Sequence, residues 1–357
     1  MKNNNLADLG EFGFISRIAA AARPGTGVVT GIGDDAAVTA LTPGMQLLAS
    51  TDMLLEDVHF RHCWHDPYRL GRKSLATSIS DIAAMGGIPR WSLLSLAIPS
   101  QTPVAFLDEF TRGYLAMAGE HGVALIGGDT CSAKHGLAIS VTIMGEQLPE
   151  LILRRSGARP GDEIWVTGTL GDAAMGLKLL ERGFGSAQPP NTIQTPNTAN
   201  TTTPPPDCSL SGVEGLISRL LDPTPRTSAG IALAESGLVS AMIDISDGVL
   251  ADFGHIAELS GVGGLFYLER LPLSAAFRAV AARFDHIPYP LALSGGEDYE
   301  LCFTASPSDR KKIDQLMKKC GIEATAVGIV TSSPEIRVVM ADGSEFTHEI
   351  SGFKHFA

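Results

Sequence analysis

The sequence has few cysteines, and none of them has the spacing of a metal or redox site. Among 357 residues there are five scattered cysteines: Cys63, Cys131, Cys208, Cys302 and Cys320. Their odd number and the lack of any Cys-x-x-Cys pair disfavour a disulfide framework, a zinc site and a redox motif. We therefore expect reduced thiols and a cytoplasmic location.

Basic residues and long apolar runs are also scarce. The chain has 27 Lys and Arg against 39 Asp and Glu, which gives a net charge of -12. This balance disfavours general attraction to nucleic acid or to an anionic membrane. No run approaches the ~20 apolar residues of a membrane span, and the polar stretch Met1 to Gly10 lacks the apolar core of a signal peptide. We expect no nucleic-acid or membrane partner, and any bound phosphate must be held locally by metals or backbone amides.

The composition otherwise supports ordered domains. Hydrophobic residues make up 44% of the chain and charged residues 18%, and the length allows two domains. Apolar periodicities predict alternating helices and strands, among them helices over 11–22 and 213–221 and strands over 91–98, 163–167 and 239–245. Ser246 can cap a further helix that runs to about Ser260. The predicted class is α/β or α+β with mixed sheets. A turn-rich break at 157–162 places the domain boundary near residue 149.

One segment departs sharply from this composition. Residues 185–211 are dominated by Pro, Thr, Asn, Gln and Ser and have almost no large apolar side chain. Such a segment cannot offset its ordering entropy by burial. We expect a disordered surface insertion without a functional role.

The chain is organised around the stretch Ser50-Thr51-Asp52, which follows the apolar run Met45 to Ala49. We interpret the run as a buried strand that ends in two hydroxyls and a carboxylate. Four further acidic clusters have a similar design: Gly31-Ile32-Gly33-Asp34-Asp35, Gly127-Gly128-Asp129-Thr130, Asp244-Ile245-Ser246-Asp247-Gly248 and Ser294-Gly295-Gly296-Glu297-Asp298. The five clusters predict one metal site assembled from strand ends across the chain.

Oxygen ligands of this kind suit Mg²⁺, which is usually held by one or two carboxylates together with substrate phosphates. The candidate ligands are Asp35, Thr51, Asp52, Asp81, Asp129, Asp244 and Asp247. Any one Gly-Asp turn is weak support, because Asp and Gly are ordinary turn residues, but the recurrence favours a metal site. Asp81 lies near the end of a helix predicted from Pro67 to Gly86, where the helix dipole disfavours a carboxylate. A plain surface Asp is the alternative there.

Two other motifs carry less weight. Gly71-Arg72-Lys73-Ser74 resembles the end of a phosphate-binding loop, but Asp66 stands where the first glycine of that motif belongs, and no strand precedes it. His59, His62 and His65 repeat every three residues around Cys63. This run has no clear helical pattern and no second cluster, which favours a structural reading over a soft-metal site.

Together the acidic motifs resemble those of the thiamine-monophosphate kinases in order and spacing, over nearly all of the chain outside the insertion. The matching stretches are Gly31 to Ala36, Ser50 to Asp52, Ser80 to Gly86, Ile126 to Thr130, Asp244 to Gly248 and Ser294 to Glu300. The family belongs to a superfamily of ATP-dependent enzymes that includes phosphoribosylaminoimidazole synthetase, selenophosphate synthetase and a hydrogenase-maturation protein.

The resemblance implies a fold, an assembly and a reaction. Residues 1–148 would form an α/β domain that binds ATP and Mg²⁺ and whose mixed sheet contributes to the barrel of a homodimer. Residues 149–357 would form an α+β domain, with the active site between the two. The reaction would be ATP-dependent, Mg²⁺-assisted, direct in-line phosphorylation of thiamine monophosphate to thiamine diphosphate, the final step in making that cofactor.

The resemblance also implies roles for individual residues. The implied magnesium ligands are Asp35, Ser50, Thr51, Asp52, Asp81, Asp129, Asp244 and Asp247. The implied nucleotide contacts are Gly128, Asp129, Arg155 and Ser246, and the implied thiamine-phosphate contacts are His59, Glu297 and Phe353. No residue is implied as a general base.

The residue chemistry supports some of these roles and leaves alternatives open. Arg155 offers donors suited to phosphate oxygens, although an Arg beside Arg154 before a turn is often only solvated. Phe353 can stack on a heterocycle or simply pack the C-terminal segment. Glu297 can meet the positive charge or the aminopyrimidine of thiamine.

Two other functions compete with this kinase activity. Another superfamily member would act on a carbonyl, carboxamide or selenide, but selenide chemistry needs a reactive Cys or Sec in a Gly-rich N-terminal segment. The hydrogenase-maturation chemistry needs a C-terminal Cys, and this chain ends in Lys354-His355-Phe356-Ala357. A non-catalytic calcium-binding protein should have compact ligand loops of about a dozen residues, whereas these carboxylates are widely spread.

Overall fold

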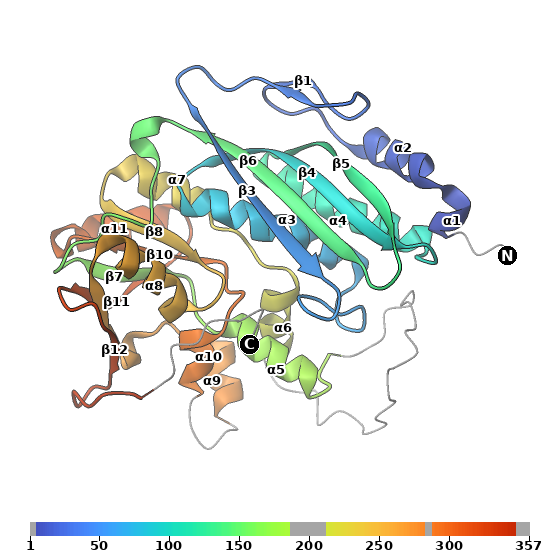
Figure 1. Cartoon of the computed structure of the whole chain (residues 1–357). Coiled ribbons are helices and arrows are strands. Elements are labelled where there is room, and N and C mark those ends of the chain that lie inside the picture. The colour runs from blue at the N-terminus through green and yellow to red at the C-terminus, as the bar shows by residue number, and fades with distance from the viewer. Residues whose placement is uncertain (1–4, 186–211, 283–287, 348–357) are drawn as a thin grey trace. The chain divides into compact units, whose positions relative to one another are not determined.

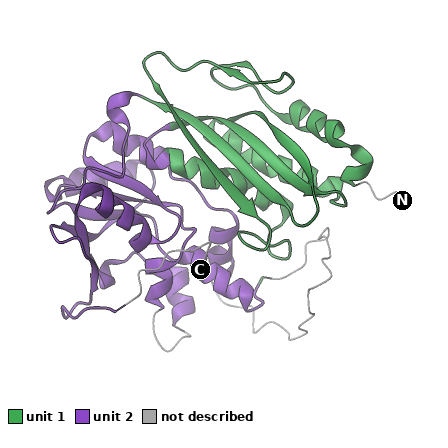
Figure 2. Cartoon of the chain, in the orientation of Figure 1, with its two compact units in different colours: residues 1–82, 88–147, 185–206 green, residues 83–87, 148–184, 207–357 purple. Residues whose placement is uncertain are grey.

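The computed structural model describes residues 5–185, 212–282 and 288–347. They fall into two compact units, shown in different colours in Figure 2. Unit 1 takes its described residues from Met1–Ile82 and Ile88–Gln147, together with Gly185, and unit 2 from Ala83–Gly87, Leu148–Phe184 and Asp207–Ala357. Within the described ranges, no helix combines the length and the apolar character that crossing a membrane requires. The predicted insertion at 185–211 lies, apart from Gly185, outside the described residues.

Unit 1 is built on a mixed sheet (Figure 1). Its described strands in the order β3-β6-β4-β5 form this four-stranded sheet, in which β4 and β5 are parallel and the other neighbours antiparallel. Two short strands, β1 and β2, pair separately. The elements are α1 (Leu6–Leu9), α2 (Glu11–Ala21), β1 (Val28–Thr30), β2 (Val38–Thr39), β3 (Gln46–Leu55), α3 (Pro67–Ala84, whose last two residues belong to unit 2), β4 (Ile88–Pro99), α4 (Val104–His121), β5 (Ala124–Ala133) and β6 (Ala138–Gln147).

Helices α3 and α4 lie along one face of this sheet (Figure 1) and approach each other closely. A Cβ atom at Gly71 would lie 2.0 Å from the Phe110 carbonyl oxygen, and one at Gly113 would lie 1.9 Å from that of Tyr68. Only glycine fits at these two crossings, because any side chain would push the helices apart. The pair therefore forms a tight helical layer on one face of the sheet.

Two strands of unit 1 are longer than the sequence predicts. Strand β3 does not end at Ser50-Thr51-Asp52, because all ten of its residues pair with β6. Strand β5 likewise continues through Asp129 to Ala133. The prediction that these motifs stand at strand ends is wrong: backbone pairing with the neighbouring strand continues although the side chains become polar.

The described residues of unit 2 form a six-stranded mixed sheet in the order β12-β9-β11-β7-β10-β8, in which β12 and β9 are parallel. Its strands are β7 (Glu163–Thr167), β8 (Val239–Ile245), β9 (Gly263–Tyr267), β10 (Glu300–Ala305), β11 (Ala324–Thr331) and β12 (Ile336–Val339). Its α-helices are α5 (Asp172–Glu181), α6 (Val213–Leu221), α7 (Thr227–Ser236), α8 (Val249–Ser260), α9 (Ala275–Ala281), α10 (Tyr289–Ser294) and α11 (Arg310–Lys319). Short 3-10 turns cover Pro149–Leu151, Leu268–Arg270 and Pro307–Asp309.

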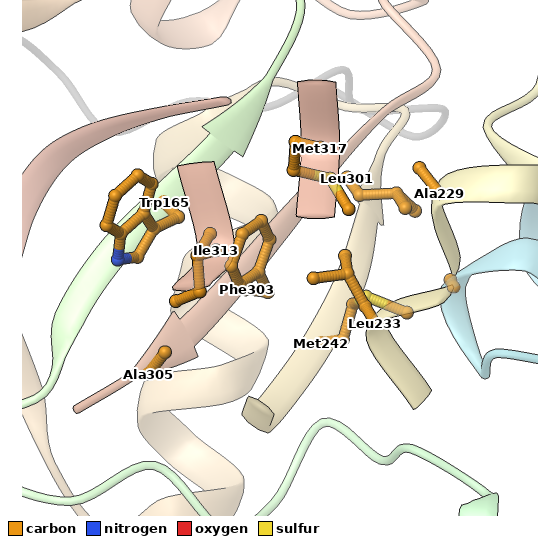
Figure 3. Close-up of a cluster of buried hydrophobic side chains, with 10 residues drawn as sticks. Trp165, Ala229, Leu233, Met242, Leu301, Phe303, Ala305, Ile313 and Met317 are labelled. Carbon is orange, nitrogen blue, oxygen red and sulfur yellow. The ribbon is translucent and has the colours of Figure 1, made fainter. Parts of the chain in front are cut away.

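A buried apolar cluster packs helices against this sheet (Figure 3). Trp165 of β7 stacks on Phe303 of β10, with ring centroids 6.1 Å apart. Ile313 and Met317, four residues apart on α11, are fully buried against them, as the helical period requires. The cluster stabilises the central strands β7 and β10, and β8 pairs with β10.

The start of α8 corrects a further prediction. Ser246 is expected to cap this helix, but the cap position is Gly248 and has no side-chain capping bond. The N–H groups before the helix instead bind Asp252, a residue of its own first turn. A carboxylate reaching back from inside the helix has replaced the predicted serine cap.

Candidate functional site

The Asp52 carboxylate lies on the face of the unit 1 sheet that packs against α3. Ser78 of α3 donates a hydrogen bond of 2.5 Å to Asp52 Oδ2. Burial raises the pKa of Asp52, and the hydrogen bond from the hydroxyl of Ser78 opposes that rise. The side chain is therefore held in one orientation by a helix behind it.

Asp81 and Ser50 form a second link between the same two elements. Ser50 Oγ donates to Asp81 Oδ2 over 2.5 Å. Ser50 and Asp52 are two residues apart on a strand, so both face α3, while Ser78 and Asp81 are three apart on a helix and share one face. The structure thus brings Ser50, Asp52 and Asp81 together.

Thr51 lies between these residues in sequence but faces the other side of the sheet. Its exposed side chain donates to the Val141 carbonyl at 3.2 Å and lies 3.2 Å from the Thr142 hydroxyl. Strand alternation therefore separates its hydroxyl from the Asp52 carboxylate. The part of Thr51 that lies next to Asp52 is its backbone, which belongs to the same strand, β3.

Two further candidate ligands of unit 1, Asp35 and Asp129, are exposed. Asp35 is in the loop between β1 and β2, where its N–H donates to the Asp34 carboxylate at 2.9 Å. Asp129 lies on β5, and the sheet order places β6 and β4 between β5 and β3. Three strand spacings correspond to about 14 Å. Within one chain the structure does not bring Asp129 to Asp52.

Gly128, a predicted nucleotide contact, approaches the neighbouring strand closely. A Cβ atom there would lie 1.8 Å from the Leu94 carbonyl oxygen. The residue is exposed, so its backbone is accessible where a side chain could not fit. This is the arrangement in which a ligand can approach a peptide group directly.

His59 occupies a tight loop directly after β3. Its Nδ1 accepts a hydrogen bond from the Leu55 N–H at 3.0 Å, so the neutral ring carries its proton on Nε2. Asp57, with φ of 64°, makes the turn. The neighbouring His62 and His65 are buried against Phe106 and Phe60, with ring centroids 5.0 and 6.3 Å apart, and burial lowers the pKa of His65.

In unit 2, the candidate residues from 244 to 247 lie at the end of β8. Asp244 is buried on the strand itself, and Ser246 and Asp247 are half-buried in the loop that follows. Oδ2 of Asp252 accepts the N–H groups of Ser246, Asp247 and Gly248 at 3.0, 3.0 and 3.1 Å. Burial raises the pKa of Asp252 to about 7, against the pull of these donors.

Glu297 lies directly against this loop. Its N–H donates to the Ser246 carbonyl at 2.8 Å, and the Tyr299 N–H donates to that of Ile245 at 2.8 Å. Glu297 and Tyr299 have φ of 70° and 49°, which non-glycine residues rarely adopt. Backbone hydrogen bonds thus join the segment that carries Glu297 to the loop that carries Ser246 and Asp247.

The residues around Glu297 are anchored by a buried polar network. Asp298 Oδ2 accepts the Gly171 N–H at 2.8 Å, and burial raises the pKa of Asp298 to about 8. Arg219 donates to the Asp298 carbonyl at 3.0 Å and to Glu300 Oε1 at 2.8 Å. Glu300 has no exposed surface and also accepts bonds from Arg226 and Thr167.

The two remaining predicted contacts are less defined. Arg155 is exposed, its carbonyl accepts a long 3.5 Å bond from Ser260, and the adjacent Arg154 carbonyl binds the Met242 N–H of edge strand β8. Phe353 lies outside the described residues.

The donor set fits magnesium better than a soft metal. All candidate ligands are carboxylate or hydroxyl oxygens, the ligands that Mg²⁺ prefers. In the part of the chain that the structure describes, no group of three or more His, Cys, Asp or Glu side chains is already gathered to hold a metal ion. Small sets such as Asp52 with Asp81 suit ions that share their coordination with substrate phosphates.

Comparisons with known proteins place these motifs in a family. The models for the N-terminal and C-terminal domains of AIR synthase related proteins match residues 33–147 and 159–341. Thiamine-monophosphate kinase from Salmonella typhimurium is 36% identical over 349 residues, covering 98% of each chain. The chain belongs to the thiamine-monophosphate kinase family. The resemblance inferred from the motifs is confirmed.

Solved structures of the thiamine-monophosphate kinase family have the same fold. The crystal structure of thiamine-monophosphate kinase from Stenotrophomonas maltophilia K279a matches with a TM-score of 0.78 and 38% identity, over 94% of this chain and 97% of that one. AaThiL complexed with AMPPCP and TMP matches with a TM-score of 0.72 and 29% identity over 100% of both chains. The mixed α/β class predicted from the sequence is confirmed.

The family motifs do not include Ser78 and Asp252, two residues that hold candidate ligands or their loop in place. Ser78 lies 26 positions after Asp52, and Asp252 lies 5 positions after Asp247. Ser78 could have been found, since it lies one helical turn before Asp81. Asp252 gives no comparable signal, because an acidic residue in the first turn of a helix is ordinary.

Proposed function

We propose that this protein transfers the terminal phosphoryl group of ATP directly, in line, to thiamine monophosphate, giving thiamine diphosphate and ADP. The observation that carries the proposal is the family match over nearly the whole chain, with the matching motif residues in the elements described above. The complex of AaThiL with AMPPCP, an ATP analogue, and TMP supports the same pair of substrates.

Magnesium ions held by oxygen ligands would neutralise phosphate charge and bridge the two substrates. In unit 1 the ligands would be Ser50, Asp52 and Asp81 with Asp35, Asp129 and the backbone of Thr51, and in unit 2 Asp244 and Asp247. Gly128, Asp129, Arg155 and Ser246 would contact the nucleotide, and His59, Glu297 and Phe353 the thiamine phosphate. These roles follow from the family motifs and from the oxygen chemistry of the residues.

The acceptor needs no general base. A phosphate monoester with a second pKa of ~6 is largely deprotonated at neutral pH. The main obstacle is the repulsion of two polyanions, since each pair of unit charges at ~4 Å costs about 4 kcal/mol at an effective dielectric of about 20. Positioning and charge neutralisation supply most of the acceleration in phosphoryl transfer.

The protein would act as a homodimer joined through the sheet of unit 1. The face of β3 opposite α3 exposes Leu47, Met53 and Leu55, at 50%, 58% and 37% of their surface. A row of apolar side chains on an uncovered sheet is costly in water and suits burial against a second copy. The same proposal includes two domains, an ATP-binding part over 1–148 and a second part over 149–357. It also includes a cytoplasmic location.

Product identification tests the function. The protein, ATP, Mg²⁺ and thiamine monophosphate are incubated together, and thiamine diphosphate and ADP are quantified by chromatography. We expect equal amounts of the two products. Release of inorganic phosphate and ADP without thiamine diphosphate would show transfer of the phosphoryl group to water and would contradict the proposed reaction.

A further inference from the structure

Asp252 is one of the most buried carboxylates of unit 2, with 3% of its surface exposed, and it is not among the residues expected to contact metal, nucleotide or thiamine phosphate. A single oxygen, Oδ2, accepts the N–H groups of three successive residues, Ser246, Asp247 and Gly248. Asp252 belongs to the first turn of α8, so a helix fixes three peptide groups of the loop before it.

This arrangement decides which atoms the loop can offer to a ligand. Successive N–H groups that converge on one point form a nest that binds anions. Here the chain's own carboxylate fills the nest, so these amides are not presented to a phosphate. The side chains of Ser246 and Asp247 are half-buried, and they offer a hydroxyl and a carboxylate, which are ligands for a hard cation.

The same loop also positions Glu297. The Ser246 carbonyl accepts the Glu297 N–H, and a Cβ atom at Gly296 would lie 2.4 Å from that carbonyl oxygen. Glu297 keeps a positive φ, which persists only where the surrounding structure holds it. A shift of Ser246 would therefore be transmitted directly to the backbone that carries Glu297.

We propose that Asp252 is a positioning residue that fixes the metal-facing Asp247 and the thiamine-facing Glu297 relative to each other. The inference rests on the function proposed for those two residues. Removing a group that orients metal ligands typically lowers metal affinity or activity 10- to 100-fold. Asp252 should thus affect the use of Mg²⁺ and of thiamine monophosphate together.

The test compares Asp252→Ala with a matched control, Asp162→Ala. Asp162 is also buried and accepts hydrogen bonds from the Arg159 N–H and the Ser240 hydroxyl, at 3.0 and 2.7 Å. Strands β7 and β8 run in the same direction, because each is antiparallel to β10. Asp162 precedes β7 and Ser246 follows β8, so the two residues lie at opposite ends of the sheet. Asp252→Asn is the conservative variant, since its amide oxygen can still accept the three N–H groups.

For Asp252→Ala we expect at least a tenfold rise in both the KM for thiamine monophosphate and the free Mg²⁺ that gives half-maximal rate. Both increases should exceed those of Asp162→Ala, measured at temperatures equally far below each variant's Tm, and Asp252→Asn should restore most of the loss. Hydrogen exchange followed by mass spectrometry should speed up in peptides covering 246–248 and 296–299. Kinetic changes no larger than those of the control would overturn the proposal.

The proposed function and this inference fail in different ways. If the wild-type protein releases no ADP with thiamine monophosphate, the function is wrong. Calorimetric binding of AMPPCP at varied Mg²⁺ then tests Asp252 alone. A weaker Mg²⁺-dependent affinity in Asp252→Ala than in Asp162→Ala supports the positioning of the metal-facing loop, and equal affinities overturn it.

Discussion

The hydroxyl of Ser78 donates a 2.5 Å hydrogen bond to the carboxylate of Asp52 and thereby ties helix α3 to strand β3. The Ser50–Asp81 bond repeats the link in the reverse sense, with the hydroxyl on the strand and the carboxylate on the helix. The paired links hold two carboxylates on one face of the sheet. Charge at this position, more than shape, should matter for turnover.

Asp52→Asn should leave the protein folded and abolish turnover. The amide oxygen can still accept the Ser78 bond, but the loss of one negative charge weakens a metal ligand without changing volume. Circular dichroism checks the fold, and ADP release checks the rate. Ser78→Ala is the matched control, because it keeps the carboxylate and should retain turnover at raised Mg²⁺. A folded Asp52→Asn variant with most of its activity would exclude Asp52 as a metal ligand.

His59→Asn should raise the KM for thiamine monophosphate and change the maximal rate less than tenfold. His59 lies on a turn after β3 with its Nδ1 accepting a hydrogen bond from the Leu55 N–H, so its other ring nitrogen, Nε2, carries a proton and has the chemistry of a donor to a phosphate oxygen. It has no proton to remove from a phosphate monoester. Steady-state kinetics with saturating Mg-ATP separate the two parameters, and a loss of maximal rate as deep as that of Asp52→Asn would contradict the base-free account.

Asp298 should make stability depend on pH. Burial raises the pKa of Asp298 to about 8 in the folded protein, from an ordinary value of 3.8. The folded protein therefore holds a proton that the unfolded chain releases between these values. The stabilisation is complete below the lower pKa and is lost as pH rises to about 8, by up to ~1.4 kcal/mol per pH unit.

Asp298→Asn removes this titration with little change of shape. Urea unfolding of both proteins from pH 5 to 9 gives the difference in their free energies of unfolding. We expect the wild type to lose stability relative to the variant up to about pH 8, with a constant difference beyond. A difference that does not vary with pH would mean that Asp298 is ionised throughout.

Glu300→Gln should destabilise the protein by about 3–5 kcal/mol, because it leaves the two mostly buried guanidinium groups of Arg219 and Arg226 without their carboxylate. Glu109→Gln is the control, since Glu109 pairs with the exposed Arg112 on one helix surface and should matter little. Chemical unfolding measures both variants. Equal effects would show that the network around Glu300 is not a buried anchor of the Glu297 loop.

Local patterns predict much of the fold. The bounds of β7, α6 and β8 agree with the prediction residue for residue, because Gly, Asp or Ser lies within two residues of each end of these apolar runs. Strands β3 and β5 are longer than predicted, since polar residues such as Asp52 occupy inward positions that a period-two pattern reserves for apolar ones. Helix α10 is too short for its period to stand out.

The sequence predicts the candidate ligands of the site, but it does not predict the residues that hydrogen-bond to them or to their loops. Carboxylates that follow glycine turns stand out in sequence, and family resemblance gives them roles. The partners Ser78 and Asp252 depend on which helix packs behind each strand, and the capping of α8 by Asp252 replaces a plausible serine cap at Ser246. Such pairings arise from tertiary packing, which propensity and spacing do not encode.

The most direct test of metal-assisted transfer to a phosphate compares ADP release with thiamine monophosphate and with thiamine, at matched ATP and over a series of free Mg²⁺ concentrations. The account predicts rapid release with the monophosphate, negligible release with thiamine, and a dependence on free Mg²⁺ steeper than first order. Efficient phosphorylation of thiamine itself would contradict it, because a neutral hydroxyl must lose a proton and no residue is assigned to take it.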